Sequence, residues 1–455
     1  MENKKGDILR EVFCLSDDHS IATFQNILRE NSKTQIEYYK YLVDLSLFCS
    51  VWKKQDLSSE ESTPVIIYAN HRINADGLSL IAKRFITLLR KKGATVCDFE
   101  YSVNSLFNIE RLKLIIEKVD NPDNLFFIYH GTWNCNLYSI LDYLRIVHVR
   151  KAGYLTWETT VLPRLYTDTY HLFDDIFVPS EFNKLVFERS LNIQCKIVPH
   201  IFSKSLDNNY LLSQKYLVAR HEMVILILNN SNDCRKNFLQ TCIWTIEWIY
   251  QKVNSDEMSK KECYKLIIKG FKGQTIEEIR RLVKLKEYEV VLGKVNIIII
   301  DEIYTEPEII NLHERSHIYV SLSHGEGVGM NVVDACLHGS VVVVPQFGGY
   351  VDYLGEDYPY YIETEINPIG TPEFYGSLPP LQKDIFHNPQ KWAFVDKNSF
   401  FRKISEARQV YQQSTEKIYR DLVSDTVRKI NYYTNQETVG NRYITQIRKT
   451  ISKYM

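Results

Sequence analysis

The sequence predicts an α/β fold with two Rossmann-like domains, each a doubly wound parallel sheet, that face a cleft. The chain has 455 residues, more than one hydrophobic core of ordinary size accommodates. Short apolar segments alternate with amphipathic ones along most of its length, the pattern of consecutive β-α-β units. Several apolar segments, such as MVILIL and VVVV, lack polar alternation, as strands buried on both faces of a sheet require.

Composition and charge narrow the classes of function. Hydrophobic residues make up 45% of the chain and charged residues 24%, which is typical of a globular protein and not of a disordered one. A formal net charge of -1 gives no reason to expect nucleic acid as a partner. The nine cysteines lack C-x-x-C spacing, which favours reduced thiols in a cytoplasmic compartment, the host cytoplasm for a viral protein. No signal core or membrane-length apolar run is visible, so peripheral contact is the membrane association left open.

The first part of the chain divides into an extension and a domain. Residues 1–62 are predicted to form a helical N-terminal extension, because apolar residues recur at mixed three- and four-residue spacings. Residues 63–205 are predicted to form the N-terminal Rossmann-like domain. Its expected strands are 65–70, 94–101, 125–130, 152–158, 175–180 and 196–202, and its expected helices are 78–93, 108–118, 135–147, 162–172 and 181–190.

A second series of the same kind follows a polar connection. Residues 210–425 are predicted to form the C-terminal Rossmann-like domain. Residues 426–455 are predicted to form a C-terminal helix, and one option is that this helix crosses back to the N-terminal domain. The expected strands are 223–228, 264–270, 295–300, 317–323 and 340–345, and the expected helices are 237–252, 275–287, 306–315 and 328–338.

A glycine-rich loop, SHGEGVGM, joins strand 317–323 to helix 328–338. Glycines allow a backbone to approach a ligand closely, and the free amides of a helix N-terminus bind phosphate. The loop also lies at the carboxyl end of a strand, where doubly wound sheets bind their ligands. The alternative is a turn that merely needs glycine, but a second open loop at Gly348–Gly349 makes a ligand site the better interpretation. Its candidate binding residues are Gly325, Gly327, Val328, Gly329 and Met330.

Charged residues accompany this loop. On a continuous helix the spacing of eight between Glu326 and Asp334 corresponds to roughly 80° and about 12 Å along the axis, so one nucleotide could span both carboxylates. Glu326 would then lie at the sugar end and Asp334 at the ribose end; the alternative is that both are solvated. Arg235 and Lys236 follow strand 223–228 at the start of a helix, where the helix dipole disfavours cations. An anionic ligand explains them better than solvation does.

These segments together resemble the retaining GT-B glycosyltransferases of the GT4 type, with their E-x7-E signature. The signature reads Glu326-GVGMNVV-Asp334 here, with aspartate in place of the second glutamate. The further matching segments are GYLTWETTVLPRLY (153–166), DDIFVPSEFNKLVFERS (174–190), KIVPHIF (196–202) and LILNNSNDCRKN (226–237), and the resemblance covers roughly residues 63–355.

The resemblance implies roles for individual residues. Arg235 and Lys236 would hold the donor diphosphate and act in catalysis together with Glu326. Glu158 would face the cleft opposite the donor; the alternative is a cap beside a buried Trp157. His130 is a further candidate contact; the alternative is a structural role, which is more common for a lone histidine after a strand. Gly77 takes the place of a first-domain glycine loop that usually has two glycines.

The implied function is transfer of a sugar from a nucleoside-diphosphate donor to a hydroxyl of a glycan, lipid or protein-linked acceptor, with retention. No D-x-D motif is present, so we expect no metal, and we expect no other cofactor. The donor nucleotide is expected to be UDP or GDP. Backbone near 269–271 and 301–304 is expected to read the base. Two alternatives remain: a non-catalytic homologue that binds a nucleotide sugar or glycan, and a nucleotide-sugar epimerase on the same fold. The sequence leaves the oligomeric state open.

Overall fold

The structure is a computed structural model. It describes residues 63–70, 77–100, 105–119, 121–132, 137–202, 222–255, 263–284, 295–369, 385–386, 389–413 and 416–452. The helical extension predicted over 1–62 lies outside the described residues. The elements below all belong to one unit of the chain, Thr63–Ile116 and Asn121–Met455.

The first sheet has six parallel strands in the order β2-β1-β3-β4-β5-β6. Because the chain passes from β1 to β2 on one side and then to β3 on the other, the strand order reverses between β1 and β3. The strands are β1 Val65–Asn70, β2 Thr95–Glu100, β3 Leu125–Gly131, β4 Arg150–Leu155, β5 Asp175–Val178 and β6 Cys195–Ile197. The connecting helices are α4 Gly77–Lys91, α5 Ser105–Ile116, η1 Pro122–Asn124, α6 Leu137–Ile146, α7 Arg164–Tyr170 and α8 Glu181–Leu191.

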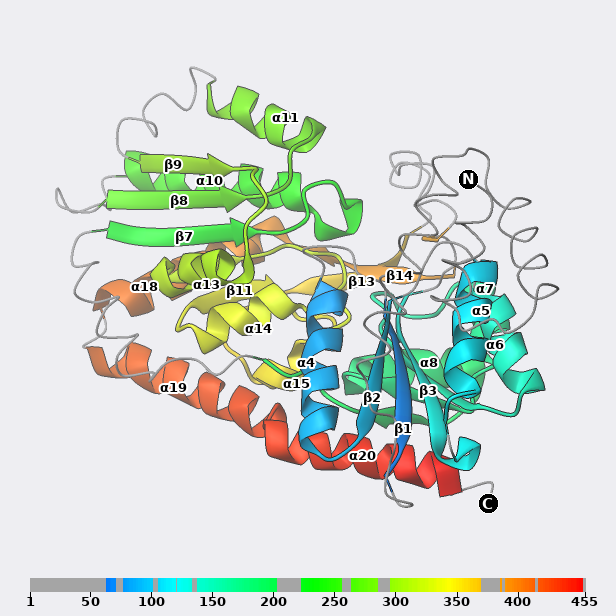
Figure 1. Ribbon diagram of the computed structural model, residues 1–455. Coiled ribbons are helices and arrows are strands. Elements are labelled where there is room, and N and C mark those ends of the chain that lie inside the picture. Colours follow the sequence, from blue (N-terminus) through cyan, green and yellow to red (C-terminus); the bar gives the residue numbers. More distant parts are fainter. Residues whose placement is uncertain are drawn as a thin grey trace, which may run out of the picture. The chain divides into compact units, whose positions relative to one another are not determined.

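The second sheet also has six parallel strands, in the order β12-β11-β10-β7-β8-β9. Its order reverses between β7 and β10, and Figure 1 shows β7, β8 and β9 pointing the same way. The strands are β7 Glu222–Leu228, β8 Cys263–Lys269, β9 Val295–Ile300, β10 Ile318–Val320, β11 Val341–Pro345 and β12 Tyr361–Ile362. The helices are η2 Cys234–Lys236, α10 Phe238–Asn254, α11 Gln274–Val283, α13 Glu306–Arg315, α14 Met330–Leu337 and α15 Val351–Leu354.

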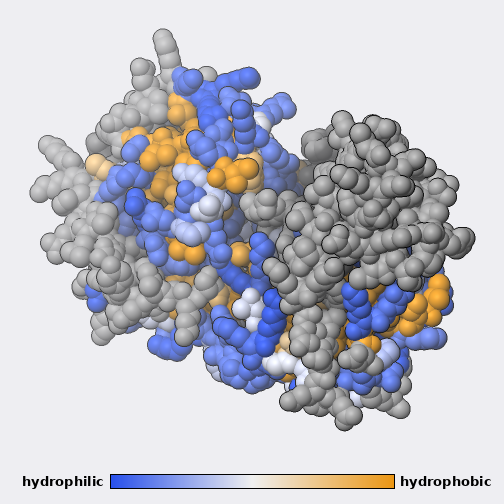
Figure 2. Space-filling model, in the orientation of Figure 1, coloured by the Kyte–Doolittle hydropathy of each residue, from blue (hydrophilic) through white to orange (hydrophobic). Residues whose placement is uncertain are grey.

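Two doubly wound parallel sheets were predicted, and this prediction is confirmed. The continuous apolar strands are buried as expected: β1 and β11 are buried over their whole length. The edge strand β9 differs, because Ile298 is 37% exposed and its neighbours are half-buried. Hydrophobic residues accordingly reach the surface over the region of β7–β9 (Figure 2).

Three helices follow the second sheet: α18 Lys397–Gln413, α19 Glu416–Tyr433 and α20 Gln436–Ser452. Helix α18 packs beside β11 and β12, and α19 packs on α14 and α15. Helix α20 packs on α4 of the first sheet (Figure 1), where Tyr443 lies against Phe85 with ring centroids 5.0 Å apart. The hydroxyl of Thr450, also on α20, hydrogen-bonds to Asp175 of β5. The last helix therefore belongs to the core of the first sheet.

Some elements were not predicted. The antiparallel hairpin of β13 Thr364–Pro368 and β14 Lys391–Val395 was missed, since β13 is polar and largely exposed. Strand β4 ends at Leu155, so Trp157 and Glu158 lie in the loop that follows and not in the predicted strand. The cysteines in the described ranges are free thiols at 97, 195, 234, 242, 263 and 336. Within the same ranges, no helix has the length and apolar character needed to cross a bilayer.

The packing of α20 makes a stability prediction. Ile447 is fully buried in the core that α20 shares with the first sheet. Replacing it with alanine removes apolar contacts and leaves a cavity, so Ile447→Ala should lower the free energy of unfolding by about 2–5 kcal/mol. Lys449→Ala, on the exposed face of the same helix, should stay within about 0.5 kcal/mol of the parent. Urea unfolding measures both, and equal effects of the two variants would contradict the packing.

Candidate functional site

A cavity of about 560 Å³ lies at the carboxyl ends of the second sheet, at the position where its strand order reverses. Two loops flank this position, one after β7 and one after β10. The cavity contains nine of the residues predicted from the sequence: Gly77, Glu158, Arg235, Lys236, Glu326, Gly327, Val328, Gly329 and Met330. These predicted residues come from both sheets, so the fold brings them together as expected for a shared site.

The two cations are presented by a single 3-10 turn, η2. The side chain of Asp233 caps this turn by accepting a hydrogen bond from the backbone amide of Arg235 at 3.0 Å. Asn237 then adopts a left-handed conformation with φ of +47°, which ends the turn and lets α10 begin. Arg235 and Lys236 therefore lie just before α10 begins, and their side chains line the cavity.

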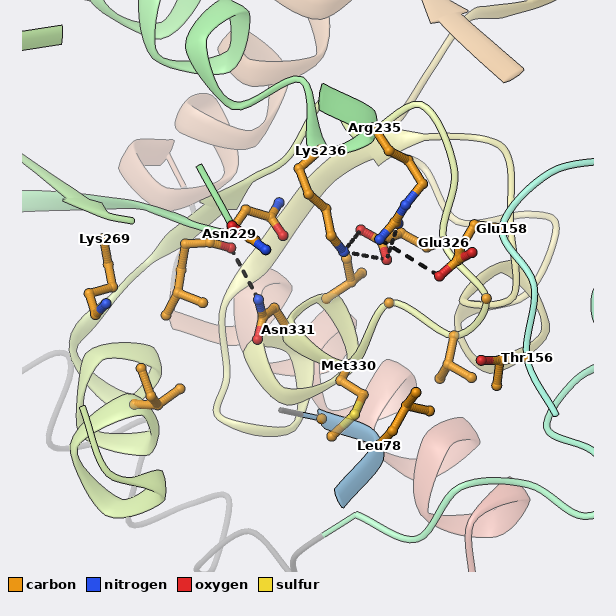
Figure 3. Close-up of a pocket in the computed structure, with 18 of the residues that line it drawn as sticks. Leu78, Thr156, Glu158, Asn229, Arg235, Lys236, Lys269, Glu326, Met330 and Asn331 are labelled. Carbon is orange, nitrogen blue, oxygen red and sulfur yellow. Dashed lines mark hydrogen bonds and ion pairs between the residues drawn. The ribbon is translucent and has the colours of Figure 1, made fainter. Parts of the chain in front are cut away.

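Both cations converge on the carboxylate of Glu326 (Figure 3). The ammonium of Lys236 donates to Oε1 at 2.6 Å and to Oε2 at 2.7 Å, and Nη1 of Arg235 donates to Oε2 at 3.3 Å. Burial alone would raise the pKa of Glu326, but the charges of Lys236 and Arg235 outweigh it and hold this pKa below its ordinary value. Glu326 is therefore an ionised carboxylate at neutral pH.

Arg235 also contacts two further carboxylates. Its Nη2 lies 2.9 Å from Asp233 and 3.7 Å from Glu158. Burial lowers the pKa of Arg235, but the three acids outweigh it and raise this pKa above its ordinary value. Burial also raises the pKa of Glu158, and Arg235 offsets this only in part. The cluster thus holds three carboxyl groups against two cations, and Glu158 is the group most easily protonated.

The glycines of the loop also approach the protein's own backbone, which was not predicted. A Cβ atom at Gly325 would lie 2.1 Å from the carbonyl oxygen of Glu158, and one at Gly327 would lie 3.2 Å from that of Trp157. Gly325 does not line the cavity: it packs against the protein's own backbone. Gly329, with φ of +72°, supplies the left-handed residue that starts α14. The glycines thus allow two segments of backbone to meet.

The interpretation of Asp334 is wrong. Helix α14 begins at Met330, four residues after Glu326, so Glu326 and Asp334 do not share a helix and the spacing argument fails. Asp334 is not among the residues that line the cavity. Burial raises its pKa to about 7, with Arg84 lowering it and Glu306 raising it. Helix α13, which carries Glu306, contacts α14.

His130 is also placed outside the cavity. It is 2% exposed, its Nδ1 hydrogen-bonds to the hydroxyl of Tyr68 at 2.7 Å, and its ring packs against Tyr154. Burial lowers its pKa to about 3, so the ring stays neutral. The structural alternative for His130 is the correct one, because its side chain points into the core of the first sheet.

Several cavity residues were missed by the sequence analysis. The position of Asn229 and Asn230 directly after β7 was the available signal. Asn331 and Tyr319 both donate to the carbonyl oxygen of Leu228, at 3.2 and 2.8 Å. The missed residues are Leu78, Thr156, His200, Leu228, Asn229, Asn230, Ile309, Tyr319, Asn331 and Val332. The other lining residues, Lys269, Phe271, Ile303 and Tyr304, lie in the two segments expected to read the base.

No protein-family model matches the sequence, and no curated protein sequence matches it either. Solved structures do match the fold. A sucrose-phosphate synthase from Thermosynechococcus elongatus matches with a TM-score of 0.59 and 12% identity, over 86% of this chain and 100% of that one. A UDP-forming α,α-trehalose-phosphate synthase from Burkholderia xenovorans matches with a TM-score of 0.52 and 10% identity, over 85% of this chain and 99% of that one.

Two further solved structures also match the chain. A trehalose-6-phosphate structure from E. coli, bound with UDP-2-fluoro glucose, has a TM-score of 0.51 and 11% identity, over 84% of this chain and 99% of that one. The match to a mutant of S. aureus TarM has a TM-score of 0.47 and 11% identity and covers 75% of this chain, but this chain spans 59% of that one, less than two thirds of its length. The matches above 0.5 agree with the two parallel sheets, and the chain has the GT-B fold.

The environment of Asp334 predicts a pH dependence. Its ordinary pKa of 3.8 is raised to about 7 in the folded protein, so the folded state binds the extra proton and its stability falls as pH rises between these values. Relative to the parent, Asp334→Asn should therefore gain stability from about pH 4 to about pH 7 and gain no more above that. Urea unfolding across this range measures the difference. A difference between Asp334→Asn and the parent that does not change with pH would contradict the shift.

Proposed function

We propose that the chain is a glycosyltransferase that moves a sugar from a nucleoside-diphosphate donor to an acceptor hydroxyl. The observation that carries the proposal is the convergence of Lys236 and Arg235 beside the first turn of α14, in a cavity where the strand order reverses. A diphosphate needs cations and amide donors at one place, and this position offers both. The UDP-2-fluoro glucose bound to the E. coli protein of the same fold supports this ligand class.

The two domains take different parts in this proposal. The second domain, 210–425, holds the nucleotide at the ends of β7–β10. The first domain, 63–205, contributes Gly77, Leu78, Thr156 and His200 to the cavity and receives the acceptor there. Glu326 and Glu158 then flank the sugar between the two. This arrangement places the reacting carbon beside the carboxylate that Lys236 and Arg235 already hold.

The proposed chemistry uses electrostatic stabilisation of the leaving group. The bond between the anomeric carbon and the diphosphate oxygen breaks, and the new bond forms to the acceptor oxygen on the same face. The acceptor proton passes to the departing diphosphate oxygen, which leaves a nucleoside diphosphate and a glycoside of retained configuration. Lys236, Arg235 and the α14 amides stabilise the charge that develops on the diphosphate, in place of a metal ion. Glu326 stabilises the positive charge that develops on the sugar.

The diphosphate site can be tested by removing its lysine. Because a hydrogen bond to a charged group contributes about 1.5–3 kcal/mol, Lys236→Ala should weaken nucleoside diphosphate binding roughly 10- to 150-fold. Calorimetric titration with UDP, GDP, ADP and dTDP gives the affinities. Lys272→Ala is the matched control, since Lys272 is exposed and outside the cavity. Unchanged affinity in Lys236→Ala would remove the basis of the proposal.

The role of Glu326 separates binding from catalysis. Glu326→Gln keeps the size of the side chain but removes the charge, so turnover should fall at least about a hundredfold. Nucleoside diphosphate affinity should stay equal or rise, because Lys236 and Arg235 lose a competing anion. Product analysis by proton NMR reports both turnover and the anomeric configuration. A parent protein that binds donor without transfer would instead be a non-catalytic binder, and interconversion of the donor sugar without acceptor would indicate an epimerase.

A further inference from the structure

A second lysine lies in the cavity, apart from the cluster around Glu326. Lys269 is the last residue of β8, is 4% exposed and lines the cavity. In the described part of the chain its ammonium donates one hydrogen bond, to the carbonyl oxygen of Gly270 at 2.8 Å. An ammonium group has three donors, so among the described residues two of them have no protein acceptor. Burying a charged ammonium without acceptors for its hydrogens costs free energy. This cost favours a role for Lys269 in binding a ligand.

Two aromatic rings surround this ammonium. Its Nζ lies 5.0 Å from the ring centroid of Phe271 and 5.4 Å from that of Tyr304, and both rings line the cavity. Burial lowers the pKa of Lys269, and the charges of Glu302 and Asp301 oppose this effect in part. Asp301 pairs with Arg280 at 3.2 Å. The surroundings of Lys269 thus combine flat apolar faces with a hydrogen-bond donor. Such a combination fits a planar heterocycle that carries acceptor atoms.

The strand order sets the distance between the two ends of the cavity. Lys236 and Glu326 follow β7 and β10, while Lys269 ends β8 and Tyr304 follows β9. Because neighbouring strands are about 4.8 Å apart, the ends of β8 and β9 lie on the order of 10 Å from the cluster around Glu326. In Figure 3, Lys269 and Glu158 lie at opposite sides of the pocket, with Lys236 between them. A nucleotide whose diphosphate binds at Lys236 and whose sugar points toward Glu158 therefore directs its base toward Lys269.

We propose that Lys269 selects the base of the donor nucleotide: its ammonium donates to an exocyclic carbonyl oxygen while the base packs against Phe271 and Tyr304. This inference rests on the proposed function. Uracil, thymine and guanine carry such an oxygen, whereas adenine carries an amino group at its edge. A lysine ammonium has no acceptor for that amino group. The chain should accordingly prefer UDP, dTDP or GDP donors to ADP donors.

The test compares nucleotide affinities in the full chain and two variants. Calorimetric titration with UDP, dTDP, GDP and ADP should show at least one carbonyl base bound about tenfold or more tightly than ADP by the parent. Methionine has an unbranched side chain of similar length but no ammonium, so in Lys269→Met this preference should shrink to about threefold or less. Lys272→Met should keep the preference of the parent, since Lys272 is exposed and outside the cavity.

The outcomes separate this inference from the proposed function. A parent that binds ADP as tightly as the others, or a Lys269→Met variant that weakens all four equally, overturns the role of Lys269 in selecting the base. If Lys269→Met does not fold, the order of nucleotide affinities in the parent still tests the inference. If none of the four nucleotides binds, the proposed function fails. If all bind and Lys236→Ala weakens them while the parent shows no preference, the inference about Lys269 fails alone.

Discussion

The loop from Gly325 to Gly329 is held by direct contact between backbones, and the position of Glu326 depends on this contact. Gly325 lies against the carbonyl of Glu158, and the backbone amide of Gly349 donates to the carbonyl of Glu326 at 2.9 Å. The side-chain amide of Asn183, in the first turn of α8, donates to the carbonyl of Gly327 at 2.6 Å. A side chain at these glycines would push the segments apart. The carboxylate that the cations bind is therefore positioned by main chain from both sheets.

The two sheets could be predicted because strands buried on both faces have a recognisable apolar sequence pattern. Strands such as β7 and β11 read as unbroken apolar runs, and the helices between them show apolar residues at three- and four-residue spacings. The position of Arg235 and Lys236 in the cavity was predicted for a similar reason. Cations at the start of a helix oppose its dipole, so their presence there indicates an anionic partner. The predicted partner was an anionic ligand, whereas in the structure both cations bind the protein's own Glu326.

The parts that escaped prediction depend on contacts between distant segments. The spacing of Glu326 and Asp334 assumed one helix, but the left-handed Gly329 delays the start of α14 until Met330. His130 follows the same strand pattern as a site residue would, and only the packing of Tyr68 and Tyr154 around it shows that it is structural. The backbone near Lys269 was expected to read the base, but the burial of its side chain in the cavity was not, because in the sequence it resembles any lysine at the end of a strand. Its burial against Phe271 and Tyr304 is set by two loops that follow different strands.

The pairing of Lys236 with Glu326 gives the cavity a counter-ion of its own. A diphosphate that enters must compete with this carboxylate for the ammonium, so part of the Coulomb attraction is already satisfied before it arrives. The same carboxylate can take back the ammonium when the nucleotide leaves, and no bare buried cation has to be exposed in between. In the proposed transferase, an internal anion of this kind would weaken the hold on a spent nucleotide and let the cavity empty after each cycle.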